Sequence, residues 1–129
     1  MKRFAAVLTA ALLPLGCGSI ETSRVMTGPP GAPYSGPVAV VMESAPPPPQ
    51  FVEVAILQAN GYGSRADLAN VIAALQAEAQ RLGCDAVIRV RVDQGYAQAS
   101  GTGVCIRTPA TWAAPPGAPP AASPPLAAP

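Results

Sequence analysis

The stretch from Arg65 to Asp93, RADLANVIAALQAEAQRLGCDAVIRVRVD, decides the fold, because its apolar residues change from a helical to a strand spacing within one short turn. In its first part, apolar residues recur every three or four positions, which places them in one stripe along a helix. The stripe consists of Leu68, Val71, Ile72, Leu75, Ala79 and Leu82. We therefore predict a helix over residues 65–82, capped by Ser64 and ended by Gly83.

Strands are predicted on both sides of this helix. In the second part of the stretch, apolar and charged residues alternate, with Ile88, Val90 and Val92 on one face of a strand. The four predicted strands cover residues 38–43, 51–58, 86–93 and 101–107. The order β-β-α-β-β predicts an α+β fold over residues 34–108, in which a small antiparallel-rich sheet is covered on one face by a single helix.

The segments that flank this domain have the composition of disordered arms. Residues 17–33 are rich in Gly, Pro, Ser and Thr and show no apolar period, which predicts a flexible tether. Residues 109–129 hold eight prolines among twenty-one residues, interleaved with alanine. This composition predicts a disordered, extended Pro/Ala-rich tail.

The N-terminus has the organisation of a signal peptide. Lys2 and Arg3 precede an apolar run of twelve residues, 4–15. A run of this length is too short for a transmembrane helix, which needs about 20 apolar residues. We therefore predict a signal peptide over residues 1–16.

The end of this signal resembles the lipobox that the lipoprotein signal peptidase reads, because Gly16 and Cys17 in LLPLGC fit that pattern. The resemblance implies lipidation of Cys17 and attachment of the mature chain to a membrane through the lipid. Gly18 after the cysteine favours the periplasmic face of the outer membrane in a Gram-negative bacterium. The alternative is an ordinary signal peptide in which Cys17 is incidental.

Composition excludes several classes of site. The sequence has no histidine, which removes His-dependent triads, Cys-His nucleophiles and imidazole metal ligands. Its single lysine is Lys2, and its formal net charge of +1 gives no electrostatic reason to expect nucleic acid as a partner. We expect no catalytic residue, no metal site and no cofactor, and therefore a protein that is not an enzyme.

Two cysteines remain in the domain if Cys17 carries lipid. In an oxidising compartment, Cys84 and Cys105 are expected to form a disulfide, which would stabilise the domain by about 3 kcal/mol. Strict strand alternation opposes this bond, because Cys84 would then point inward and Cys105 outward. A β-bulge near Gly101 or Gly103, or a Cys84 that lies before the strand begins, would remove the conflict. The alternative is that the two thiols bind a metal or take part in redox chemistry.

Arginines supply a further candidate contact. Arg89, Arg91 and Arg107 are predicted on the sheet face away from the helix, where they could bind an anionic group. The alternative is an ordinary solvated face, which antiparallel sheets normally have. Glu43 and Glu53 are predicted on adjacent strands, where we expect exposed carboxylates and no acid–base pair.

The stretch EAQRLGCDAVIRVRVD, followed by SGTGVCIR, is similar to the YbjQ-type family, for which heavy-metal binding has been suggested. It also resembles the domain of the Rcs-pathway envelope-stress sensor lipoprotein. The matching positions are Leu82, Gly83, Ala86, Val87, Val90, Val92, Asp93, Gly101, Thr102 and Val104. The resemblance implies the same fold and, from the YbjQ-type members, self-association into a homo-oligomer. It carries no metal site over, because Cys84 stands where those members usually have Ala and the chain lacks histidine.

These features predict a lipid-anchored envelope lipoprotein that acts as a non-catalytic interaction or stress-sensing module. The alternative function is a metal- or thiol-redox-binding protein that uses Cys84 and Cys105. The expected partners are the membrane, through the N-terminal lipid, and an envelope protein, lipopolysaccharide or peptidoglycan.

Overall fold

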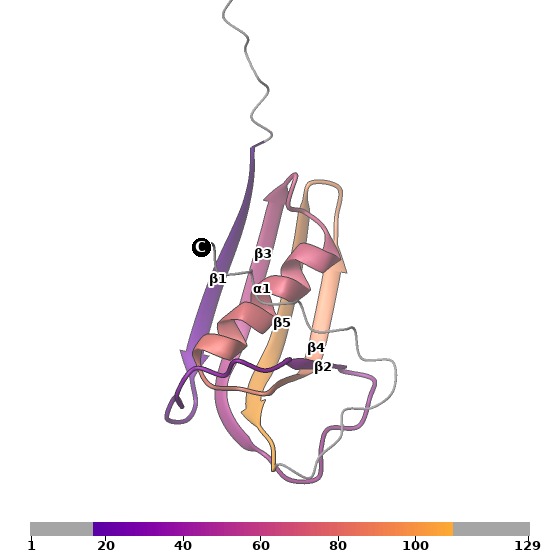
Figure 1. Cartoon of the computed structure of the whole chain (residues 1–129). Coiled ribbons are helices and arrows are strands. Elements are labelled where there is room, and N and C mark those ends of the chain that lie inside the picture. Colours follow the sequence, from indigo (N-terminus) through magenta and orange to yellow (C-terminus); the bar gives the residue numbers. More distant parts are fainter. Residues whose placement is uncertain (1–16, 110–129) are drawn as a thin grey trace, which may run out of the picture.

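One five-stranded sheet and a single helix make up the part of the chain that this computed structural model describes, residues 17–109 (Figure 1). The elements are β1 (Gly18–Met26), β2 (Ala39–Met42), β3 (Val52–Gly63), α1 (Leu68–Arg81), β4 (Ala86–Gln94) and β5 (Gln98–Arg107). The helix packs on one face of the sheet, which confirms the predicted α+β class and the single covering helix. The sheet contains one strand more than the sequence predicts.

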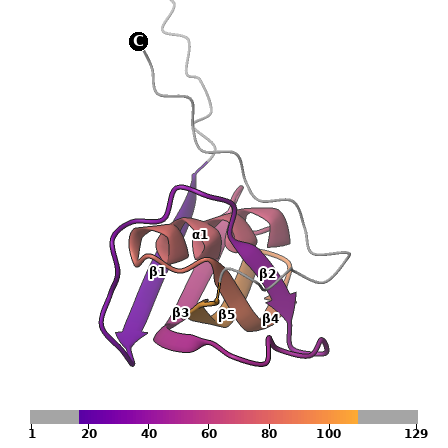
Figure 2. The same cartoon turned by 60° about the horizontal axis from the view of Figure 1, so that its bottom comes forward.

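The sheet has the order β1-β3-β5-β4-β2, so that β5 lies at its centre and β1 and β2 form its two edges. The pairs β1–β3, β3–β5 and β5–β4 are antiparallel, whereas the four-residue β2 runs parallel to β4. Since β1 and β2 are consecutive in the chain but lie at opposite edges, the segment between them must cross the sheet. Figure 2 shows this segment passing over α1.

The crossing segment, residues 27–38, is fastened to the C-terminal half of α1. Tyr34 N donates a hydrogen bond to Gln80 O (2.8 Å). In the other direction, the buried side chain of Gln76 donates through Nε2 to Val38 O (2.9 Å). The helix is therefore enclosed between the sheet and this segment, and a polar residue is satisfied inside the enclosure.

The edge strand β1 is the main departure from the predicted organisation. The sequence predicts a flexible tether over residues 17–33, but residues 18–26 form a nine-residue strand, so the prediction is wrong for this part. β1 pairs with β3 along its whole length, from Gly18 opposite Gly63 to Met26 opposite Ala55. It escaped prediction because it is mostly polar and exposed, so that no apolar alternation marks it.

The helix begins and ends at residues with defined caps. Asp67 is the N-cap, and its Oδ1 accepts a hydrogen bond from Asn70 N (2.7 Å). The prediction that Ser64 caps the helix is therefore wrong by three residues. Gly83 adopts a φ of +80°, which is the left-handed conformation that commonly ends helices and which the sequence predicts at this position.

A β-bulge in β4 decides which face each of its residues occupies. Arg89 has a φ of +53°, and the pairing of β4 with β5 shifts register after Ile88. Val87 and Val90 therefore pack toward α1, whereas Ile88 belongs to a cluster on the other face. The prediction that Ile88 shares a face with Val90 is wrong, because strict alternation does not continue through a bulge.

Each face of the sheet carries an apolar cluster. The larger cluster lies between the sheet and α1, around Leu57, Val71 and Leu75. The smaller cluster lies on the opposite face at the end of the sheet where β4 begins, and the segment between β2 and β3 packs on it through Phe51. Its buried members are Val41, Ala86, Ile88 and Ile106. The face away from α1 is thus covered at one end and open over the rest.

Two predicted segments lie largely outside the described residues, namely the signal peptide at 1–16 and the Pro/Ala-rich tail from 110 onward. Within residues 17–109, no helix is long and apolar enough to span a membrane.

Candidate functional site

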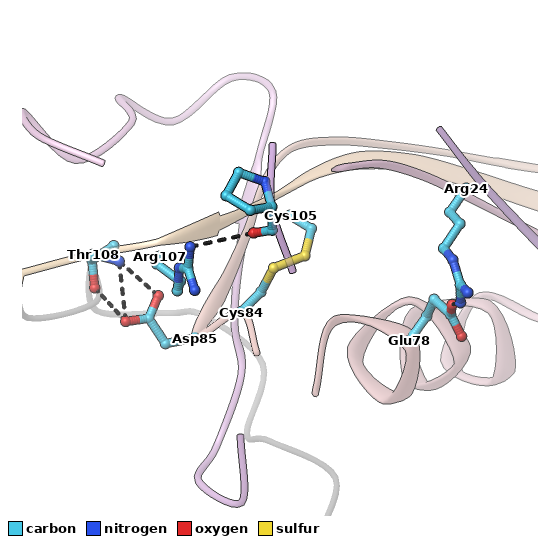
Figure 3. Close-up of a disulfide and its surroundings, with 8 residues drawn as sticks. Arg24, Glu78, Cys84, Asp85, Cys105, Arg107 and Thr108 are labelled. Atoms are coloured by element: carbon cyan, nitrogen blue, oxygen red, sulfur yellow. Dashed lines mark hydrogen bonds and ion pairs between the residues drawn. A yellow bond between two sulfur atoms is a disulfide. The ribbon is translucent and has the colours of Figure 1, made fainter. Parts of the chain in front are cut away.

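A disulfide joins Cys84 to Cys105, with 5.7 Å between their Cα atoms (Figure 3). Both residues are completely buried in the cluster beneath α1. Cys84 lies in the turn between α1 and β4, before the strand begins, and its N donates to Ala79 O (2.9 Å). The predicted bond is therefore present, and Cys84 lies before its strand begins, as one of the two predicted alternatives has it. The other alternative, a bulge near Gly101 or Gly103, is wrong, because the extra residue lies in β4 between Ile88 and Arg91.

The predicted orientation of Cys105 is wrong. Along β5, the residues that face α1 are the odd-numbered ones, since a Cβ at Gly101 would meet Val71 and Leu75 of the helix. Cys105 shares this face and lies opposite Val87 in the register. The error arose from β4, because the bulge at Arg89 shifts the alternation from which the face of β5 was inferred.

A polar cluster follows the disulfide at the same end of the sheet. Both carboxylate oxygens of Asp85 accept from Thr108 N (3.0 and 3.1 Å), and Thr108 Oγ1 donates to Asp85 Oδ2 (2.7 Å) (Figure 3). Asp85 directly follows Cys84 in the chain. The Asp85–Thr108 hydrogen bonds and the disulfide therefore together hold the end of β5 against the start of β4. This cluster fixes the point from which the C-terminal segment departs.

The three predicted contact arginines do not form one cluster. Arg91 lies opposite Thr102 on the face away from α1, and its Nε pairs with Glu43 Oε2 at 2.9 Å. Arg89 is exposed at the bulge. Arg107 shares the α1 side with Cys105, two residues earlier on the same strand, and its Nη2 donates to Pro29 O (3.4 Å). The prediction that all three point away from the helix is therefore wrong for Arg107.

The two predicted strand carboxylates are also far apart in the sheet. Glu53 lies on β3 opposite Ile106, and Glu43 directly follows β2. Because β5 and β4 lie between β3 and β2, the prediction that these two residues occupy adjacent strands is wrong. Glu43 instead neutralises Arg91 at the surface.

The face away from α1 carries a row of apolar residues that runs from its open part into the smaller apolar cluster, and the sequence did not predict this row. In the pairing register, Val25 lies opposite Ile56, Ile56 opposite Val104, and Val104 opposite Ile88, so that the row crosses four strands. At the β1 end of this row, 64% of Val25 and 47% of Ile56 are exposed. The row could not be recognised without knowing that residues 18–26 form a strand. We call Val25, Ile56, Val104 and Ile88 the apolar row.

Polar residues lie beside this row on β4 and β5. A hollow of about 420 Å³ is lined by Arg91, Val92, Asp93, Ser100, Gly101 and Thr102. Its side chains offer hydroxyl groups, one carboxylate and a guanidinium that is already paired with Glu43. The open face thus combines an exposed apolar strip with hydrogen-bonding groups, which is the composition of many protein contact surfaces.

Glu78 is the one buried carboxylate among the described residues, with 7% of its side chain exposed. It pairs with Arg24 of β1 and with Arg81 of its own helix, the latter at 2.9 Å. Burial acts to raise the pKa of Glu78, but the hydrogen bonds and charges of Arg24 and Arg81 outweigh it and hold this pKa below the usual glutamate value. The group is therefore a structural anion that binds β1 to α1.

Cys17, the predicted lipidation site, is exposed and has a free thiol. It directly precedes β1. Across residues 17–109, no three His, Cys, Asp or Glu side chains are grouped as a metal site would require.

No protein family matches this sequence, and no curated protein or solved structure is significantly similar to the chain. The resemblance to YbjQ-type proteins therefore stays a prediction from the sequence pattern.

Proposed function

We propose that the protein is a lipid-anchored lipoprotein of the bacterial cell envelope that acts as a non-catalytic interaction or stress-sensing module. The signal-peptide pattern and the Leu-Gly-Cys ending at residues 15–17 support the anchor. The location follows from the same pattern, and the periplasmic face of the outer membrane is the proposed destination.

The observation that carries the proposed interaction role is the exposed end of the apolar row, which lies on the open part of the face away from α1. Val25 and Ile56 lie side by side in the register and expose about half or more of their surface. Exposed apolar residues grouped on a flat face, with polar groups beside them, favour a protein partner over a small substrate. The expected partner is another envelope protein, and a second copy of this chain is the homo-oligomeric form of the same proposal.

The burial of the disulfide argues against the alternative function, in which Cys84 and Cys105 bind a metal or exchange electrons. Both sulfurs lie in the apolar cluster under α1, and neither residue is accessible to solvent. Reactive cysteines are typically accessible, whereas a buried bond between two structural elements serves stability. We therefore assign this disulfide a structural role.

Site-specific photo-crosslinking in intact envelopes tests the interaction role. A photoreactive phenylalanine analogue at Ile56 should give one discrete adduct, because this residue lies within the apolar row. The matched control carries the analogue at Tyr34, which is also partly exposed but lies on the α1 side. Equal labelling at both positions, or no adduct at Ile56, would contradict the proposed contact surface.

A further inference from the structure

The residue that would carry the lipid is held against the end of the sheet, with no linker between it and the fold. Cys17 is followed directly by β1, whose first residue, Gly18, pairs with Gly63 at the end of β3. The contact is close: a Cβ added to Gly63 would lie 2.2 Å from the carbonyl oxygen of Cys17. Gly63 also has a φ of +58°, a conformation that favours glycine. Both this φ and the close approach of the Cys17 carbonyl oxygen therefore require a glycine at position 63.

Two further segments share this end of the molecule. The first is the turn from β3 to α1, residues 63–67, which lies beside Cys17. The second is the hairpin between β4 and β5, residues 94–98, which is joined to this turn by a hydrogen bond from Gly63 N to Ala97 O (3.2 Å). Figure 1 shows the start of β1, the end of β3 and this hairpin together at the top of the sheet. We call the start of β1 with Cys17, the turn at residues 63–67 and the hairpin at residues 94–98 the anchor end.

An aromatic side chain projects from the anchor end into solvent. Tyr96 occupies the tip of the hairpin and is fully exposed. The hairpin itself is closed by a hydrogen bond from Gly95 N to Gln98 O (2.7 Å), so its tip is held in place. A tyrosine has an apolar ring and a polar hydroxyl group, and such side chains are enriched at the interface between a bilayer and water.

We propose that the anchor end rests on the bilayer surface, with Tyr96 in the headgroup region and the strands directed away from the membrane. This inference rests on the proposed lipidation of Cys17. One residue spans at most about 3.6 Å, so acyl chains on Cys17 bring the adjoining turn to the surface of the bilayer. A tether over residues 17–33 would have permitted any orientation, whereas an edge strand that begins at Gly18 does not.

The orientation has a consequence for the open face. β1 has nine residues, which at about 3.3 Å each reach about 30 Å from the anchor. The disulfide end and the start of the C-terminal segment would therefore lie farthest from the membrane. The apolar row would run parallel to the membrane surface, and its exposed residues Val25 and Ile56 would be accessible to partners that diffuse along the same membrane.

Positive and negative charges are balanced at the anchor end, so the proposed docking does not require a negatively charged bilayer. Arg65 lies in the turn beside Cys17, and Asp67 caps the helix two residues later. With both signs present, docking depends on the lipid anchor and on Tyr96 and needs no excess of anionic lipid. Vesicles of a zwitterionic phospholipid therefore suffice for a test.

Depth-dependent fluorescence quenching tests this orientation on the full processed protein purified from its membrane. Trp112, the single tryptophan, is first replaced by Phe, and a new tryptophan is introduced by Tyr96→Trp. The matched control is Tyr34→Trp in the same background, since Tyr34 lies beside the C-terminal half of α1, away from the anchor end. The proteins are reconstituted into vesicles of zwitterionic phospholipid with bromines near the headgroups.

The tryptophan of the Tyr96→Trp variant should lose at least about half of its emission to the brominated lipid, and that of the Tyr34→Trp variant should lose little. Equal quenching of the two variants, or quenching of neither, would overturn the orientation. Intact mass of each sample separates this failure from a failure of the proposed function. A protein that carries acyl chains on Cys17 but shows no quenching after Tyr96→Trp refutes the orientation alone, whereas a protein without acyl chains refutes the lipoprotein proposal and this inference with it.

Discussion

Arg24 of β1 donates a hydrogen bond to the buried carboxylate of Glu78 on α1, fifty-four residues later in the chain. Arg24 lies opposite Leu57 in the register, which places its side chain on the face that α1 covers. Main-chain pairing with β3 holds β1 on one side, and this ion pair holds it to the helix on the other. The Arg24–Glu78 pair therefore holds β1, the strand that begins directly after the proposed anchor Cys17, against α1.

Replacing the carboxylate should weaken the attachment of β1. Glu78→Gln removes the charge that Arg24 and Arg81 share while keeping the size of the side chain. Arg24 is 49% exposed, so solvent screening reduces the loss, and we expect the free energy of unfolding to fall by about 1–2 kcal/mol. Urea unfolding followed by circular dichroism measures it. The control is Glu43→Gln, which breaks a pair with Arg91 in which both side chains are mostly exposed, and this change should cost less. Equal losses would contradict the structural role of Glu78.

The same carboxylate should make the stability depend on pH in the acidic range. The pKa of Glu78 is lower in the folded protein than in the unfolded chain, so the unfolded state binds more protons as pH falls. Its stabilising effect is complete above the ordinary glutamate pKa of about 4.3 and is lost as pH falls through the lowered value. Unfolding measured between pH 7 and pH 3 should therefore show a smaller decline for Glu78→Gln than for the unaltered protein. Parallel curves would show that Glu78 contributes nothing to the acid sensitivity.

The buried disulfide should be a major source of stability for so small a domain. Its cysteines are 21 residues apart, and a loop of this size is worth about 3 kcal/mol in the chain-entropy model. Cys84→Ala combined with Cys105→Ala should lower the free energy of unfolding by about that amount. The control is Cys17→Ser, which changes an exposed cysteine outside the disulfide and should leave the stability of the domain unchanged. A double variant as stable as the unaltered protein would refute the structural role of the bond.

Arg89 offers a substitution that should stabilise the protein. Its φ of +53° lies in the left-handed region, which costs a residue with a Cβ about 1–2 kcal/mol and costs glycine little. Arg89→Gly should therefore raise the free energy of unfolding by about 0.5–1 kcal/mol after the greater entropy of glycine in the unfolded chain is counted. Arg91→Gly, two residues away and outside the left-handed region, should be destabilising instead. A change of the same sign in the free energy of unfolding for both substitutions would contradict a cost of the left-handed conformation at Arg89.

The sequence predicted the parts of the fold that are marked by apolar periodicity. Val71, Leu75 and Ala79 of the predicted stripe are buried on the side of α1 that packs on the sheet, and Gly83 ends the helix as expected. Local chemistry was enough for these elements, because an amphipathic helix and its stop are encoded within the segment itself.

The features that escaped prediction depend on tertiary partners. β1 has no apolar pattern, and it is a strand because β3 presents a long edge to it. The orientation of Cys105 could not be inferred because one residue, Arg89, adopts a conformation that its side chain does not favour. The apolar row followed from both, since Val25 has a neighbour in Ile56 only once β1 is in place.

The lipid anchor and the buried disulfide are tested together by the intact mass of the mature protein from its native membrane, taken with and without reduction and alkylation. We expect a chain that begins at Cys17 and carries two or three acyl groups. No cysteine should be alkylated before reduction, and Cys84 and Cys105 should be alkylated after unfolding and reduction. A chain without acyl groups, whose cysteines alkylate freely before reduction, would contradict both the anchor and the structural disulfide.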